Sequence, residues 1–285
     1  MLFASFCFAV MGGFAKELSK DMSAIEVVFF RNVFGLFFIL LTVFKYPIKQ
    51  KGGKLWLLLF RGFMGFAALL AFFYNIAHIS LAEAMTYSRT SPIFTALFAF
   101  LFLKERLHKV GWVALFVGFA GILFITRPYG MYDFDKYDML GLFSGLGAAL
   151  AYTAVRELRE YYDTRSIVLS FMGVGTLGPI LLMVIGYFYA PKDLDYLFAS
   201  FVAPQRSDIL LILFLGISAT LAQYYMTKAY GETKAGIVGA VSYSNIIFSI
   251  MIGLMLGDKL PDLYTSIGIV LIVFAGVMIT FQPKS

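Results

Sequence analysis

The chain has very little of the residue types that build disulfide and metal sites. Its 285 residues include one cysteine, Cys7, and two histidines. A single cysteine excludes an intramolecular disulfide, and so few thiol and imidazole ligands give no basis for a metal site. We therefore expect no metal and no cofactor. Charged residues are also scarce, at 14% of the chain against about 25% in average soluble proteins.

Several motifs of catalysis and nucleotide binding are missing from the sequence. It has no G-x-x-x-x-G-K-[ST] phosphate loop, no H-E-x-x-H and no G-x-S-x-G. The nearest approach to a paired-aspartate protease motif ends at Asp258, without a second intramembrane aspartate. An intramembrane enzyme is therefore only a remote alternative. The net charge of +6 is spread over short loops, so no basic domain for nucleic acid is expected.

What the chain has in abundance is apolar sequence. Hydrophobic residues make up 60% of it, compared with roughly 45–50% in soluble domains. A membrane-spanning helix needs about 20 mostly apolar residues. Ten segments qualify, near 1–18, 24–44, 55–78, 82–103, 108–126, 139–158, 165–189, 208–230, 236–256 and 262–281. The predicted fold class is an all-α integral membrane protein with ten transmembrane helices.

The two halves of the chain resemble each other in register. Ala15-Lys16-Glu17-Leu18 matches Val155-Arg156-Glu157-Leu158 at an offset of 140, and Gly121 matches Gly276 at an offset of 155. We predict two five-helix repeats, at 1–130 and 139–285. Because five is odd, the two copies must cross the membrane in opposite directions, which is the inverted arrangement of many secondary transporters.

Lysine and arginine are more frequent in the loops on the side of the two termini than on the other side. By the positive-inside rule, this bias predicts that both termini are cytoplasmic. The expected location is the inner (plasma) membrane of a bacterial-type cell, in contact with membrane lipids.

Polar residues at membrane depth are costly unless they face the bundle interior or a wet cavity. In the ninth segment Ser242, Asn245 and Ser249 recur at helical spacing, and their repeat partners include Arg89 and Pro92. Gln223 and Thr227 form a second stripe, whose partners in the third segment include Asn75. We expect a cavity between the repeats. The candidate substrate-binding residues are Asn75, Tyr87, Arg89, Ser91, Tyr152, Gln223, Thr227, Ser242, Tyr243 and Asn245, and the candidate gating or coupling residues are Glu17, Glu83 and Pro92.

Each polar group also has a structural interpretation, because Ser, Thr and Gly often pack helices in membranes. Arg89 can either bind cargo or pair with an acid such as Glu83. Arg31 and Arg61 are about two turns into their segments, and the sequence favours structural or interfacial cations that snorkel to the surface.

The stretches Glu26-Val27-Val28-Phe29-Phe30-Arg31-Asn32, Ala82-Glu83-Ala84 through Ser91-Pro92, and Glu105-Arg106-Leu107 followed by Gly111 resemble the drug/metabolite transporter superfamily, EamA type. The resemblance implies two inverted repeats, a cavity lined chiefly by spans 1, 3, 4, 6, 8 and 9, and movement of small organic metabolites without ATP. The second repeat departs from the pattern, with Asn245 where a proline would stand and Gly257-Asp258 in place of a lysine–glutamate pair, so equal helix breaking in the two halves is not expected.

The leading functional hypothesis is a secondary transporter that moves an amino acid or a related zwitterionic or anionic metabolite by alternating access. Protons or another ion are possible coupling partners. A lipid or lysolipid transporter on the same fold is the alternative.

Overall fold

The computed structural model describes residues 1–46, 48, 50–102, 109–126, 135–189, 191, 194–232 and 241–280. In this part of the chain the regular structure is helical throughout. The helices are α1 (Leu2–Leu18), α2 (Ala24–Lys45), α3 (Leu55–His78), α4 (Leu81–Ser88), α5 (Ser91–Phe102), α6 (Lys109–Thr126), α7 (Lys136–Leu158), α8 (Thr164–Phe188), α9 (Arg206–Glu232), α11 (Ser244–Met255) and α12 (Leu263–Thr280). By length and composition, α2, α3, α7, α8 and α9 are long and apolar enough to cross a membrane. The all-α membrane fold is confirmed.

Side chains at helix starts explain several of these boundaries. Ser23 caps α2 together with Glu26, Ser80 caps α4 together with Glu83, and Asp135 caps α7. In each of these capping boxes the first residue accepts from a backbone N–H, and the carboxylate three residues later accepts from the cap's own N–H. The polar residues thereby satisfy donors that the helix itself leaves unpaired.

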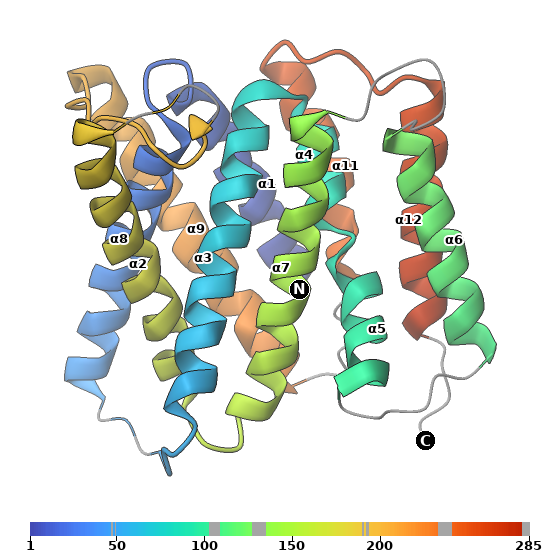
Figure 1. The fold of residues 1–285 in the computed structure, drawn as a ribbon, viewed down its shortest axis with the longest axis horizontal. Helices are drawn as coiled ribbons and strands as arrows, with labels where there is room; N and C mark the ends of the chain where they lie inside the picture. The colour runs from blue at the N-terminus through green and yellow to red at the C-terminus, as the bar shows by residue number, and fades with distance from the viewer. Residues whose placement is uncertain are drawn as a thin grey trace.

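The helices form one bundle, in which α2 and α8 lie side by side (Figure 1). Arg165, at the start of α8, donates to the carbonyl of Tyr46, at the end of α2, over 2.7 Å. Lys54, just before α3, pairs with Glu157 near the end of α7. The repeat-equivalent helices α2 and α8 are therefore antiparallel neighbours, as the inverted arrangement requires.

The fourth and ninth predicted spans are not continuous helices. The fourth is divided into α4 and α5 at Arg89 and Thr90. These two residues lie in the turn just before Pro92, where a proline disfavours a continuous helix. In the ninth, Val241 and Ser242 are helical, Tyr243 is a turn, and α11 begins at Ser244. At the repeat offset of 153, Thr90 corresponds to Tyr243. Both repeats are therefore interrupted at equivalent positions, although only the first has a proline there, and the expectation that the two halves would break unequally was wrong.

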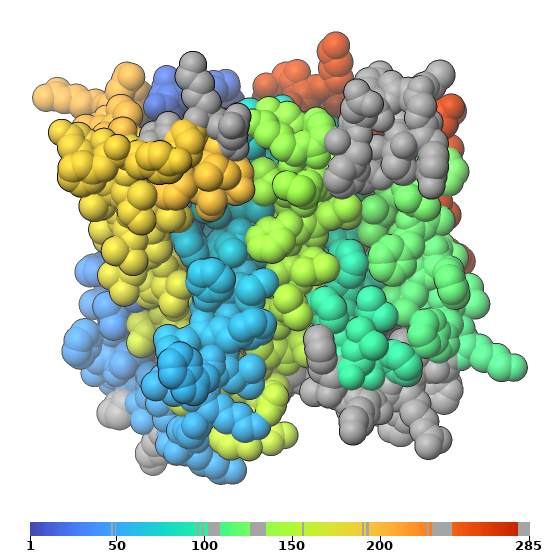
Figure 2. Space-filling view, in the orientation of Figure 1, coloured from blue at the N-terminus to red at the C-terminus, as the bar shows by residue number. Residues whose placement is uncertain are grey.

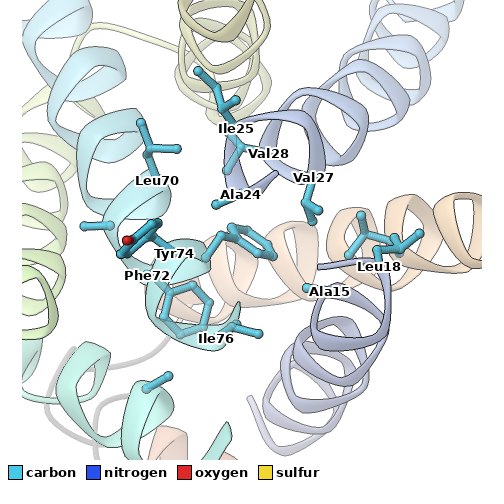
Figure 3. Packing of buried hydrophobic residues seen from close by; sticks show 14 of the residues in the cluster. Ala15, Leu18, Ala24, Ile25, Val27, Val28, Leu70, Phe72, Tyr74 and Ile76 are labelled. Atoms are coloured by element: carbon cyan, nitrogen blue, oxygen red, sulfur yellow. The ribbon is translucent and has the colours of Figure 1, made fainter. Parts of the chain in front are cut away.

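The main core cluster joins α1, α2 and α3 with α4 and α9, and apolar side chains such as Leu18, Val28 and Phe72 belong to it (Figure 3). The outer face of the bundle is also apolar, and α3, α6, α7 and α8 contribute to the face seen in Figure 2. Trp56 on α3, Phe116 on α6 and Phe188 on α8 are 85%, 72% and 80% exposed. So large an exposed apolar area fits a surface that faces lipid rather than water.

Candidate functional site

A cavity of ≈ 80 Å³ lies in the middle of the bundle and is walled by helices of both repeats. The lining residues are Phe8, Met11, Arg31, Arg61, Gly65, Ala68, Leu69, Phe72, Met85, Ser88, Arg89, Ser91, Ser144, Ala148, Ala151, Tyr152, Phe171 and Gln223. Three of them are arginines, and no aspartate or glutamate is among these described residues. The cavity therefore has a strongly cationic wall.

Arg31 and Arg61 are the main departure from the sequence-based interpretation. Their exposed fractions are 1% and 3%, so neither reaches the membrane surface. The expectation of interfacial cations was wrong because both side chains turn inward, onto an aromatic ring. The guanidinium carbons of Arg31 and Arg61 lie 5.1 Å and 4.5 Å from the ring centroid of Phe171 on α8. Such cation–π contacts stabilise a desolvated cation by about 0.5–2 kcal/mol.

The position of Arg31 is set by a proline on the facing helix. Pro179 lies inside α8 and has no N–H, so it cannot bond to the carbonyl of Gly175 one turn earlier. Asn32 fills this vacancy, because its Nδ2 donates to the Gly175 carbonyl over 3.0 Å. The Oδ1 of Asn32 then accepts from Nη1 of Arg31 over 2.7 Å. A side chain at position 175 would collide with Asn32, since a Cβ there would be 2.6 Å from Nδ2.

Arg61 has room for its guanidinium because Gly65 follows one turn later on α3. A Cβ at Gly65 would lie 3.0 Å from Nη1 of Arg61 and 2.9 Å from the Phe171 ring. The sequence Arg61-x-x-x-Gly65 thus builds a niche in which the cation and the ring can meet.

Arg89 ends α4 at the break of the fourth span, and its Nε donates to Oδ1 of Asn245 on α11 over 3.2 Å. Its guanidinium carbon lies 5.5 Å from the ring centroid of Phe8. Asn245 also donates to the carbonyl of Ser5 on α1 over 2.8 Å. Asn245 therefore connects the two broken spans with the first helix.

The predicted substrate-binding residues divide into two groups. Arg89, Ser91, Tyr152 and Gln223 line the cavity. Asn75, Tyr87, Ser242, Tyr243 and Asn245 are buried but are not part of its wall, and the side chain of Thr227 lies outside the described residues. The resemblance implied a lining from spans 1, 3, 4, 6, 8 and 9; in the described residues the wall instead includes α2 and α8, the second and seventh spans, and excludes α11.

Asn75 and Tyr87 hold the start of α7 instead. Nδ2 of Asn75 donates to the carbonyl of Tyr137 over 2.9 Å, and the hydroxyl of Tyr87 donates to the carboxylate of Asp138. Both contacts lie at the end of the bundle where α3 ends and α7 begins.

The predicted gating residues lie away from the cavity wall. Glu17 pairs with Lys20 over 2.7 Å, and Glu83 accepts from the Ser80 hydroxyl over 2.8 Å in the cap of α4. Pro92 is in the first turn of α5, where backbone N–H groups make no hydrogen bond within the helix, so the proline costs the helix none.

Ion pairs link the helices at the two ends of the bundle. At the end that we name the Lys16 side, Lys16 on α1 pairs with Asp258, which also accepts from the backbone N–H of Leu81 over 2.8 Å. At the opposite end, the Lys54 side, Lys54 pairs with Glu157. The side chains of Lys16 and Asp258 are 18% and 15% exposed, whereas both partners of the second pair are 39% exposed.

Sequence reasoning missed Arg31, Arg61, Ser88 and Phe171 as cavity residues. One available signal was Asn32 beside Arg31, since two adjacent polar residues deep in an apolar helix cannot both snorkel. The glycine one turn after Arg61 was a second signal. The ring of Phe171 had no such signal, because one phenylalanine among 32 in the chain does not stand out.

Comparison with known proteins identifies the family of this chain. The model of the EamA-like transporter family matches twice, over residues 1–127 and 135–281. The chain belongs to the EamA-like transporter family. An "Uncharacterized transporter" of Helicobacter pylori is 38% identical over 282 residues, covering 98% of this chain and 92% of the relative. A "Pseudopaline exporter" of Pseudomonas aeruginosa is 34% identical over 282 residues, covering 99% of this chain and 94% of the relative.

A solved crystal structure shares the fold of this EamA-like transporter, with a TM-score of 0.60 and 16% identity, covering 97% of this chain and 96% of the other. The protein is therefore an integral membrane protein, and its family and relatives indicate transport of small molecules rather than catalysis.

Proposed function

We propose that this EamA-like protein is a secondary transporter that moves a small organic metabolite with a zwitterionic or anionic group across the inner membrane. The observation that carries the proposal is the central cavity, which both repeats line and which presents arginine and aromatic side chains. A guanidinium fork binds a carboxylate through two parallel hydrogen bonds, and a ring offers an apolar platform beside it.

Alternating access follows from the repeat architecture. Two inverted repeats that rock about a shared site open it to one side at a time. The ion pair of Lys16 with Asp258 and that of Lys54 with Glu157 lie at opposite ends of the bundle and are suited to closing the two sides in turn. The positive-inside bias supports an orientation with both termini, and therefore the Lys54 side, in the cytoplasm.

Coupling to protons stays a prediction. The candidates are Glu17, Glu26, Glu83 and Glu157, and none of these four lines the cavity. The idea fails if replacing each of them by glutamine leaves transport and its pH dependence unchanged.

The test is uptake of a radiolabelled metabolite panel by proteoliposomes that contain the protein or an obstructed variant. Ala148 lines the cavity, so Ala148→Phe fills it and is expected to abolish transport. Val270 on α12 is 65% exposed on the outer face, so Val270→Phe adds a similar bulk outside the cavity and should leave transport intact. Full transport by a folded Ala148→Phe variant would disprove the site. Movement of a fluorescent lysolipid, with no metabolite transported, would favour the lipid alternative.

A further inference from the structure

We propose that Arg31 and Arg61 together form an anion-binding site in the cavity and that the cargo carries at least two carboxylate groups. This inference rests on the proposed function and deepens it by naming the substrate class. It differs from the sequence-based hypothesis, in which Arg89 alone met the anion.

The first argument is that these two arginines have buried donors without acceptors. Nε of Arg31, and Nε and Nη1 of Arg61, are shielded from solvent and have no hydrogen-bond partner among the described residues. Buried polar groups are normally paired, and exceptions mark a missing water, ion or ligand. Both side chains line the cavity, so its contents are the available acceptor.

The second argument is charge. A cation held away from water without a counter-ion is strongly unfavourable. The cavity wall has three arginines and, among the described residues, no carboxylate, although acids are present at both ends of the bundle. A ligand with two negative charges would neutralise Arg31 and Arg61.

The third argument is preorganisation. Asn32 is held on the Gly175 carbonyl and fixes Nη1 of Arg31, which leaves Nε for another acceptor. Phe171 lies against both guanidinium groups, and the missing side chain of Gly65 lets Arg61 and Phe171 approach each other. These supports orient two planar forks before any ligand arrives, and planar forks match carboxylates better than spherical anions.

The experiment measures thermal stabilisation of the purified, detergent-solubilised protein by citrate and by succinate. The uncharged analogue succinamide, inorganic phosphate and chloride are compared at equal concentration and ionic strength. The variants are Arg31→Gln, Arg61→Gln and the charge-retaining Arg61→Lys. Arg165→Gln serves as the matched control, because Arg165 lies outside the cavity, beside Asp163 at the start of α8.

We expect citrate and succinate to raise the Tm and succinamide to have no effect. Arg31→Gln and Arg61→Gln should weaken the apparent citrate affinity at least about tenfold, and Arg61→Lys should weaken it less, since it keeps the charge and loses the fork. Without ligand, Arg61→Gln should melt at the same temperature or higher, because it removes an uncompensated charge. Arg165→Gln should bind citrate as the unmodified protein does.

An equal shift with succinamide, phosphate or chloride would overturn the assignment, and so would citrate binding that survives both glutamine variants. A ligand-free Tm lowered by Arg61→Gln, with citrate affinity unchanged in Arg61→Lys, would make the arginine structural. If a zwitterionic or monoanionic metabolite is transported and Ala148→Phe blocks it while citrate does not bind, this inference falls and the proposed function stands.

Discussion

The two repeats build the same helices but contribute different chemistry to the cavity. At the offset of 140, Arg31 on α2 corresponds to Phe171 on α8, and these two equivalent residues lie in contact. All three lining arginines belong to the first repeat, whereas the second supplies Phe171, Tyr152 and Gln223. Helix packing can thus stay nearly symmetric while the lining is charged on one side and aromatic or neutral on the other.

The same comparison explains one hydrogen bond in detail. Gly35 faces Met172, and Gly175 faces Asn32, so the two close approaches are equivalent at the offset of 140. Pro179 has Ile39 as its equivalent. Ile39 has a backbone N–H for the Gly35 carbonyl, so the facing residue, Met172, need not supply a donor. Pro179 has no N–H, so the Gly175 carbonyl needs the donor that Asn32 supplies.

Exchanging Arg31 and Phe171 should give the largest effect on transport. Arg31→Phe removes a cation and leaves Asn32 without its donor. Phe171→Arg replaces the ring that Arg31 and Arg61 share with a third cation. Each single variant is expected to lower the transport rate about 10–100-fold, as for the loss of a charged hydrogen bond of 1.5–3 kcal/mol.

The double variant restores one arginine facing one phenylalanine and should recover at least about a tenth of the original rate in proteoliposomes. Such recovery would show that the cavity needs an arginine facing a phenylalanine, whichever repeat supplies the arginine. A double variant no better than the worse single variant would show that the first repeat alone can carry the cation.

Replacing Asn32 by methionine makes the first repeat like the second and should mainly affect stability. Asn32→Met leaves the Gly175 carbonyl and Nη1 of Arg31 unpaired, which should lower the free energy of unfolding by about 1–3 kcal/mol. Chemical unfolding in detergent micelles measures the change.

Pro179→Ala returns an N–H to α8, and this N–H can bond to Gly175. Asn32→Met should therefore be less damaging in the Pro179→Ala background, and the double-mutant cycle should show coupling of about 0.5–3 kcal/mol. Strictly additive effects would mean that the proline and Asn32 act independently.

The ten-helix architecture was predictable because it rests on length and apolarity, which each segment shows by itself. The cavity could be predicted only in part. Arg89 stood out in a polar run beside Pro92, whereas the direction of Arg31 depends on Pro179, which is 148 positions away in the chain and acts through Asn32. The break at Tyr243 was also missed, because no proline marks it.

The two ends of the bundle differ in burial, and this difference predicts unequal closure. Ser88→Cys in a Cys7→Ala background places one thiol in the cavity wall. Asp258→Asn removes the partner of Lys16 and weakens the acceptor of the Leu81 N–H, so labelling from the Lys16 side by a membrane-impermeant maleimide should rise several-fold.

Glu157→Gln breaks a pair whose partners are 39% exposed, and such pairs contribute at most about 1 kcal/mol. Labelling from the Lys54 side should therefore change less than that seen with Asp258→Asn. Equal effects at both ends would show that burial of the ion pairs does not set how firmly each end closes.

The smallest expected effect is a pH dependence of stability to which the two ends contribute alike. Burial alone would raise the pKa of Asp195, but the hydrogen bond from Tyr74 and the charge of Lys136 outweigh it and lower that pKa. Because the folded pKa lies below the unfolded value of about 3.9, the stabilisation is complete above that value and is lost as the pH falls through the folded pKa. Lys136 and Asp195 are 45% and 44% exposed, so solvent screening limits the effect to a few tenths of a kcal/mol.

Asp195→Asn should slightly flatten the fall in Tm at acid pH. Asp163→Asn, at the other end of the bundle, should do the same, because Arg165 lowers the pKa of Asp163 against the effect of burial. The two variants together should add, since the groups lie at opposite ends of the bundle, and an acid limb that neither variant changes would show that other groups control acid unfolding.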